Sequence, residues 1–302
     1  LLFILLIPLL FFSCDVTRKL NNDQLLISTQ NIYSKDTLVK SRELYRQLTQ
    51  ETNTKILGYP LKLQIYNLAQ LEPEQRFISW INSKEKRKDR LVSLLSKRQV
   101  IKLKKSWVGL HNAIKKTGEQ PTLFDDAKTE KSLDKLESWY WNHGWFNAEA
   151  TYDVDPDSIA KTVKVNYRIQ PGNQYIIDSI SENIDSKAAD TLYQLIKKNN
   201  SVKIGKPYNT EEFNADRDFI TNYFRNHGLY HFEKEYISYY ADTLDNDYKI
   251  NLDLNITDRL IEVRDTVASV PFKIHRISQV NVFADYDGNT TKVEDSVVYQ
   301  NT

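Results

Sequence analysis

The chain is poor in the residues that catalytic and cofactor-binding sites most often require. Its 302 residues include one cysteine, five histidines and eight glycines, and no methionine. A single cysteine excludes an intrachain disulfide, and so few thiol and imidazole ligands argue against a metal site. The shortage of glycine argues against a glycine-rich nucleotide-binding fold. The lack of methionine, even at position 1, predicts that this sequence is a fragment without its natural start.

The chain also lacks an excess of charge of either sign. Lys plus Arg is 41 and Asp plus Glu is 40, so the net charge is +1. A dedicated nucleic-acid-binding protein needs a basic excess to neutralise phosphates, and this class is therefore not expected. No serine or cysteine nucleophile stands in a motif with a positioned base, so we expect no enzyme, no cofactor and no small-molecule substrate. The composition is globular, and the length predicts about two domains.

One long hydrophobic run is present, at Leu1–Phe12, and it contains Pro8. It is too short for a membrane-spanning helix, which needs about 20 residues, but fits the hydrophobic region of a secretory signal. Ser13-Cys14 follows directly, and the pattern resembles a lipobox. We therefore expect residues 1–13 to be a lipoprotein signal peptide and Cys14 to be acylated. The alternative is a buried N-terminal strand or helix that ends in a core cysteine.

An acylated Cys14 would hold the chain stably at outer-membrane lipid, because each buried methylene contributes about 0.8 kcal/mol. Only one acidic residue, Asp15, follows the cysteine before Arg18 and Lys19. This favours soluble domains that face the periplasm rather than the cell surface.

An internal repeat dominates the rest of the sequence. Asn142-His143-Gly144 recurs 84 positions later as Asn226-His227-Gly228, each copy after a segment of helical periodicity. Gly144 and Gly228 are expected to end these helices in the left-handed conformation. Two strands with alternating apolar residues follow each glycine, and a strand and a helix precede each helix. The repeat therefore predicts tandem β-α-α-β-β domains of the α+β class, each a three-stranded sheet packed by two helices.

This pattern sets the expected domain boundaries. The expected parts are a first domain at 14–172 with an insertion at about 55–121, a second at 173–258, a linker at 259–271, and the truncated start of a third domain at 272–302.

The repeat resembles the POTRA domain, the polypeptide-transport-associated domain. The resemblance rests on the glycine after an aromatic-rich helix, in Trp139–Phe146 and Tyr223–Tyr230, and on the lead-in Gly205–Asn209. It implies the Omp85 superfamily of BamA and TamA, in which POTRA arrays precede an outer-membrane barrel. The lipobox and the insertion narrow it to the lipid-anchored form of TamA found in Bacteroidota. No series of ten-residue alternating strands occurs, so the C-terminal barrel is expected to be absent from this fragment.

The resemblance implies a periplasmic arm that binds polypeptides by β-augmentation and guides them to a barrel. Its expected partners are unfolded outer-membrane protein clients and a TamB-like inner-membrane protein. The binding edge is expected in the strand after each glycine, at Phe146–Val154 and Phe232–Ala241. The candidate residues are Phe146, Ala148, Ala150, Tyr152, Phe232, Tyr236 and Tyr240. The alternative is a lipid-anchored scaffold or adaptor that reaches the TamB-like partner without handling clients.

Lys84–Lys105, within the insertion, holds ten basic residues against Glu85 and Asp89. This run is either a solvated face or a surface for anionic lipid or an acidic partner. The candidate basic residues are Lys84, Lys86, Arg87, Lys88, Arg90, Lys97 and Arg98. The apolar residues of Leu91–Leu95 are expected to pack on the domain.

The aromatic and histidine residues near the repeated glycines have simple explanations. Trp139, Trp141 and Trp145 are expected to serve core and interdomain packing, rather than to stack on bases or sugars. His227 and His231 are separated by the helix-ending Gly228 and so do not share a helical face, which argues against a metal site.

Overall fold

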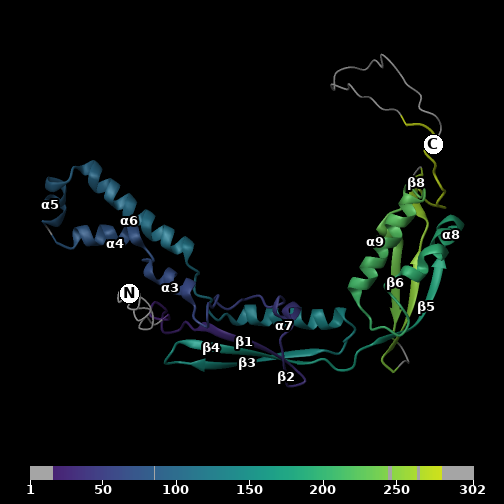
Figure 1. Cartoon of the computed structure of the whole chain (residues 1–302), viewed down its shortest axis with the longest axis horizontal. Helices are drawn as coiled ribbons and strands as arrows, with labels where there is room; N and C mark the ends of the chain where they lie inside the picture. Colours follow the sequence, from purple (N-terminus) through teal and green to yellow (C-terminus); the bar gives the residue numbers. More distant parts are fainter. Residues whose placement is uncertain (1–15, 85, 244–246, 264–265, 281–302) are drawn as a thin grey trace, which may run out of the picture. The chain divides into compact units, whose positions relative to one another are not determined.

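The computed structural model describes residues 16–84, 86–243, 247–263 and 266–280 (Figure 1). The predicted signal peptide and Cys14 lie outside these ranges. The chain divides into two compact units, Leu1–Tyr175 and Ile176–Thr302, and each has its own hydrophobic core. The mixed α+β class is confirmed in both units.

The first unit is built on a four-stranded sheet in the order β2-β1-β4-β3. Its strands are β1 (Leu26–Ser34), β2 (Thr37–Val39), β3 (Glu149–Asp157) and β4 (Thr162–Gln170). β1 runs parallel to β4, and the other pairs are antiparallel. The prediction of three strands missed β2. This short strand forms because Lys35 and Asp36 adopt positive φ angles of 47° and 59°, which allow a tight hairpin.

Two helices lie on this sheet, α2 (Arg42–Tyr45) and α7 (Asp126–Asn142). Asp125 caps the start of α7, and its side chain accepts a hydrogen bond from the Lys128 amide at 3.2 Å. Figure 1 shows α7 running along one face of the strands. The core between them contains Ile27, Ile32, Leu44, Leu136, Tyr140, Val163, Val165, Tyr167 and Ile169. The other face carries polar side chains such as Asn31 and Asn166, which are hydrogen-bonded at 2.9 Å.

The region predicted as an insertion, at about 55–121, is helical. It contains α3 (Leu61–Leu68), α4 (Pro73–Asn82), α5 (Arg87–Leu94) and α6 (Lys97–Thr117). α6 begins with a capping box, because the Ser96 and Gln99 side chains each bond the other residue's amide. Leu63 of α3 is buried against Leu20 and Leu26, which ties the insertion to the start of β1.

The second unit follows the predicted β-α-α-β-β order. It contains β5 (Ile176–Ile184), α8 (Lys187–Ile196), α9 (Thr210–Asn226), β6 (Ile237–Asp242) and β7 (Lys249–Ile256), with 3-10 turns η1 (Lys197–Asn199) and η2 (Lys234–Tyr236). The sheet order is β5-β7-β6, with β5 parallel and β6 antiparallel to β7. The core is lined by Leu192, Ile196, Ile220, Phe224, Leu229, Phe232, Ile237, Leu254 and Ile256.

The segment predicted as a linker, 259–271, instead forms a hairpin of β8 (Arg259–Val263) and β9 (Thr266–Val270). Phe272, predicted to open a third domain, is buried in the second unit. Its ring lies 5.0 Å from that of Phe232, and its amide donates to the Ser186 hydroxyl at 2.8 Å. Residues 281–302 of the expected third domain lie outside the described ranges, and that domain stays a prediction.

Candidate polypeptide-binding edges

Each repeat turns sharply at its glycine and then enters a strand. Gly144 and Gly228 have φ angles of 88° and 97°, which residues with a side chain rarely adopt. The Trp145 amide donates to the Tyr140 carbonyl at 3.0 Å, and the Leu229 amide donates to the Phe224 carbonyl at 3.0 Å. The Gly144 and Gly228 amides donate to the Trp141 and Arg225 carbonyls. Each pair of bonds forms a Schellman motif. The glycines therefore end α7 and α9 and direct the chain toward β3 and β6.

β3 and β6 both lie at the outer side of a sheet, as the resemblance implies. An edge strand carries amides and carbonyls that no neighbouring strand pairs, so it can accept an additional strand. Both edges begin later than the sequence pattern suggested. Phe146 and Ala148 precede β3, where Phe146 contacts Trp141 at a ring distance of 5.1 Å. Ala150 and Tyr152 lie on β3 itself.

Two residues that were predicted to lie on the second edge strand lie elsewhere. Phe232 is fully buried, and its ring lies 4.8 Å from that of Phe224, so it serves the core. Tyr236 lies in the 3-10 turn η2, before β6 begins. Alternating apolar residues alone could not separate this turn from a strand. Tyr240 is on β6 and is 63% exposed.

The outer edge of β3 is partly closed. Successive residues of an antiparallel strand alternate between pointing their backbone amide at the neighbouring strand and pointing it outward. On β3 the outward row is made by the backbone nitrogens of Ala150, Tyr152, Val154 and Pro156. The Ala150 amide already donates to the Glu137 carboxylate of α7 at 2.7 Å. Pro156 has no amide hydrogen, and proline within a sheet is typical of an edge strand. Only Tyr152 and Val154 therefore offer outward amides along this row.

The Tyr152 side chain adds a second tie between β3 and α7. Its hydroxyl donates a hydrogen bond to the Asp126 carboxylate, and this bond raises the pKa of Tyr152 to about 12. Glu137 and Asp126 thus hold β3 against the helix from two points. Neither contact was expected from the sequence.

The outer edge of β6 is closed at its start and open further along. The Thr257 amide donates to the Tyr236 carbonyl at 3.0 Å, which fixes the alternation and turns the amides of Ile237, Tyr239 and Ala241 outward. Of these, the Ile237 amide already donates to the Lys234 carbonyl at the end of η2. The row contains no proline, and among the described residues no side chain is seen to bond these three amides. The Tyr239 ring packs on Phe213 at 5.0 Å, and burial raises its pKa. β6 therefore presents two free outward amides, at Tyr239 and Ala241, in a row without proline.

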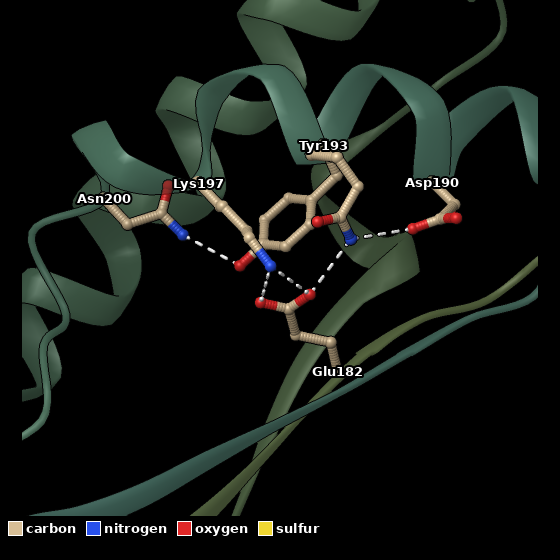
Figure 2. Close-up of polar contacts among 6 residues, drawn as sticks. Glu182, Asp190, Tyr193, Lys197 and Asn200 are labelled. Atoms are coloured by element: carbon tan, nitrogen blue, oxygen red, sulfur yellow. Dashed lines mark hydrogen bonds and ion pairs between the residues drawn. The ribbon is translucent and has the colours of Figure 1, made fainter.

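β5 is the second edge of this sheet, and it was not among the edges expected from the sequence. Its start is covered, because Ile177 exchanges backbone hydrogen bonds with Gly205 and Lys206 at 2.7 and 2.8 Å. Further along, Glu182 reaches toward the helical side, where Lys197 lies 3.3 Å away (Figure 2). In the same view Asn200 donates to the Tyr193 hydroxyl at 3.1 Å. A three-stranded sheet whose last strand is central has its first strand at the second edge. The expected order of elements could therefore have indicated β5 as an edge.

The candidate basic residues all belong to α5, α6 and the turns that flank α5. Lys84, Lys86, Arg90, Lys97 and Arg98 are exposed, and none forms an ion pair within the described ranges. Arg87 instead lies over the Trp80 ring, 4.9 Å from its centroid, and donates to Ser83. The side chain of Lys88 is not described. The expectation that the apolar residues beside this run pack on the domain is wrong for Leu94, which is 82% exposed.

Of the tryptophans near Gly144, Trp139 and Trp145 pack within the first unit, whereas Trp141 is 50% exposed. Trp139 stacks on His143 at 4.0 Å and lies 6.3 Å from Trp145, and both indoles border the core. In the second unit His227 stacks on Tyr223 at 3.8 Å. No group of three or more metal-binding side chains occurs in the described residues. Within the same part of the chain, no helix combines the length and hydropathy of a membrane span.

A model of the family described as "POTRA: Surface antigen variable number repeat" matches residues 78–172. This match runs from within α4 to just past β4. It leaves out β1, which is separated from its partner β4 by the insertion. A comparison with curated proteins gives no match.

Several solved structures are similar to the chain. BamA from Haemophilus ducreyi lacking POTRA domains 1–3 is 13% identical, with a TM-score of 0.30 over 47% of this chain. The chain covers only 25% of that BamA. BamA POTRA3–5 from Haemophilus influenzae is 10% identical, with a TM-score of 0.28 over 79% of this chain and 99% of that one. CdiB from Escherichia coli is 8% identical, with a TM-score of 0.25 over 83% of this chain and 30% of that one. The chain is thus an α+β protein whose first unit contains a match to the POTRA family over residues 78–172.

Proposed function

We propose that the chain is the periplasmic POTRA arm of an outer-membrane protein assembly or translocation factor of the Omp85 superfamily. The observation that carries the proposal is the outer edge of β6, which follows a helix-ending glycine and on which the outward amides of Tyr239 and Ala241 are free among the described residues. The POTRA match in the first unit supports the same assignment. The arm has no catalytic role in this proposal.

The proposed chemistry is β-augmentation, in which an extended client adds a strand to β6. Main-chain hydrogen bonds supply the affinity, so binding needs little sequence specificity. This suits a protein that receives many different unfolded outer-membrane precursors. The exposed Tyr240 ring offers an apolar contact on the sheet face away from the helices. The β3 edge, with Pro156 and the Glu137–Ala150 bond, serves as the weaker site.

The finer proposal places the chain in TamL, the lipid-anchored form of TamA. Acylated Cys14 would hold it at the outer membrane, the arm would guide clients to a C-terminal barrel, and a TamB-like protein would be its inner-membrane partner. The alternative is a lipid-anchored scaffold that bridges to this partner without client handling. An open β6 edge favours client handling, because a scaffold gains nothing from unpaired amides that invite aggregation.

The test is Ala241→Pro, which removes one outward amide at an exposed position. Proline is tolerated at outward-facing edge positions, so the unit should stay folded by circular dichroism. The probe is a labelled synthetic peptide with the sequence of one barrel strand, followed by fluorescence anisotropy. We expect at least tenfold weaker binding, because a main-chain hydrogen bond is lost and the ring blocks close approach.

Tyr240→Ala is the matched control, because it changes a side chain on the same strand and keeps every amide. It should weaken peptide binding far less than the proline variant. Equal binding by wild type and a folded Ala241→Pro variant would refute the edge proposal. A wild-type chain that ignores the peptide but binds a purified TamB-type domain would support the scaffold.

A further inference from the structure

We propose that the helical insertion α4–α6 is a docking element for an anionic phospholipid surface, with α6 lying along that surface. This function goes beyond polypeptide binding at the sheet edges and does not depend on it. It rests on the charge, the exposed apolar side chains and the packing of one helix.

The first observation is that the charged side chains of α6 are all basic. The helix is 21 residues long and contains seven lysines and arginines and no acidic residue. Lys104 forms an ion pair with Glu74 of α4 at 2.9 Å, and Lys115 donates to the Leu71 carbonyl. Arg98, Lys102 and Lys105 are exposed, and the described residues offer them no ion-pair partner. Their spacing of i, i+4 and i+7 places them in one row along the helix.

The second observation is a row of large apolar side chains that remain exposed on α6. Leu103, Trp107 and Leu110 are 42%, 37% and 55% exposed, and they too are spaced i, i+4 and i+7. In an ordinary surface helix such a row faces the core. Ile78 and Trp80 of α4 are also exposed.

The inner face of α6 is already occupied, so the exposed row does not simply lack a domain to pack on. His111 is buried, and its Nδ1 accepts a hydrogen bond from the Gln70 amide at 3.2 Å. At the end of the helix, a Cβ added to Gly118 would lie 2.4 Å from the Tyr66 amide nitrogen, so α6 meets the α3 backbone closely. At about 100° per residue, the basic row is centred about 150° around the helix from His111, and the apolar row about 70° from it on the other side, where Trp107 packs on the His111 ring at 4.5 Å. The small residues Ser106, Gly109 and Ala113 lie between them.

This arrangement favours a lipid surface over an acidic protein. A helix with one row of Leu and Trp and a separate row of Lys and Arg has the composition of helices that lie in a membrane interface. Tryptophan prefers the headgroup region, and each basic side chain near an anionic surface strengthens binding about fivefold. An acidic protein would use the basic row and leave the apolar row in water.

The experiment measures co-sedimentation with vesicles of phosphatidylcholine mixed with phosphatidylglycerol, and with vesicles of phosphatidylcholine alone. Residues 16–302 are used, so that neither the signal peptide nor an acyl chain contributes. We compare the wild type with the triple variant Arg98→Gln, Lys102→Gln and Lys105→Gln, and with Leu103→Ser plus Leu110→Ser. Circular dichroism shows whether each variant keeps its helix content. Lys187→Gln, Lys198→Gln and Lys206→Gln, at exposed positions in the second unit, make the same charge change as a control.

We expect the wild type to bind the anionic vesicles and not the neutral ones. The basic triple variant should bind about 100-fold more weakly, the leucine variant at least about tenfold more weakly, and the control within about threefold. The proposal is overturned if the wild type does not bind, if it binds both vesicles equally, or if the folded triple variant binds as well as the control. Binding to polyglutamate without binding to vesicles would overturn it too and assign the surface to an acidic polypeptide. None of these outcomes depends on peptide binding at β6.

Discussion

At the residue scale, glycine is required at Gly228 for two separate reasons. Its φ angle of 97° lies in the left-handed region, and a Cβ at this position would lie 2.7 Å from the His275 carbonyl oxygen. Gly205, in the same unit, has a similar φ of 83°, but a Cβ at that position would have no heavy atom within 4 Å. A comparison of alanine substitutions at the two positions therefore separates the cost of backbone strain from the cost of steric contact.

Gly228→Ala should lower the free energy of unfolding of the second unit by about 2–4 kcal/mol, and Gly205→Ala by only about 1 kcal/mol. Backbone strain is common to both, and only Gly228→Ala must also push back the segment around His275. Urea unfolding followed by far-ultraviolet circular dichroism measures both values. Equal losses would show that the close approach of residues 274 and 275 costs nothing.

At the element scale, β3 is held to α7 by two side-chain bonds rather than by strand pairing on its outer side. Glu137 accepts from the Ala150 amide, and Asp126 accepts from the Tyr152 hydroxyl. On β6, by contrast, no side chain among the described residues bonds the outward amides of Tyr239 and Ala241. The Glu137 and Asp126 bonds also give the β3–α7 contact a dependence on pH.

Tyr152→Phe should destabilise the first unit by at most about 1 kcal/mol at pH 7, because the bond is solvent-exposed. The pKa of Tyr152 is raised from 10.0 to about 12 in the folded chain. The difference in the free energy of unfolding between the wild type and Tyr152→Phe is therefore fully present below pH 10 and is lost as the pH rises to about 12. Urea unfolding of both proteins at several pH values, followed by tryptophan fluorescence, checks this. A difference that stays constant to pH 12 would contradict the role of the hydroxyl.

At the scale of the whole molecule, the two units have separate cores and separate optical probes. All five tryptophans, at positions 80, 107, 139, 141 and 145, belong to the first unit. Tryptophan fluorescence therefore reports the first unit alone, whereas circular dichroism reports both.

Phe224→Ala should destabilise the second unit by about 3–5 kcal/mol, because this fully buried ring lies at the centre of its core. The circular dichroism transition should move to lower urea, while the fluorescence transition should not shift. Leu136→Ala, at a fully buried position in the first unit, is the matched control and should shift the fluorescence transition. A shift of fluorescence in Phe224→Ala would mean that the units unfold together.

Much of the architecture was predictable because it depends on local patterns. The repeated Asn-His-Gly, the alternation at Ile250–Ile256 and the helical spacing before each glycine act over a few residues, and they determine helices, turns and the buried face of a central strand. The same patterns predicted the insertion between the first strand and α7. They also predicted that the strand after each glycine would start at once, which failed at Phe146 and Phe232.

The sequence by itself thus determined a tandem α+β chain with a basic, helix-bearing insertion and little material for catalysis. Only the tertiary structure decided that Phe232 is core, that Phe272 is buried in the second unit, and that β8 pairs with β9. It also decided which amides face outward on β6 and that the Leu103 row of α6 remains exposed. The physical reason is that burial and strand register depend on contacts between residues far apart in the chain, whereas periodicity records only the neighbours along it.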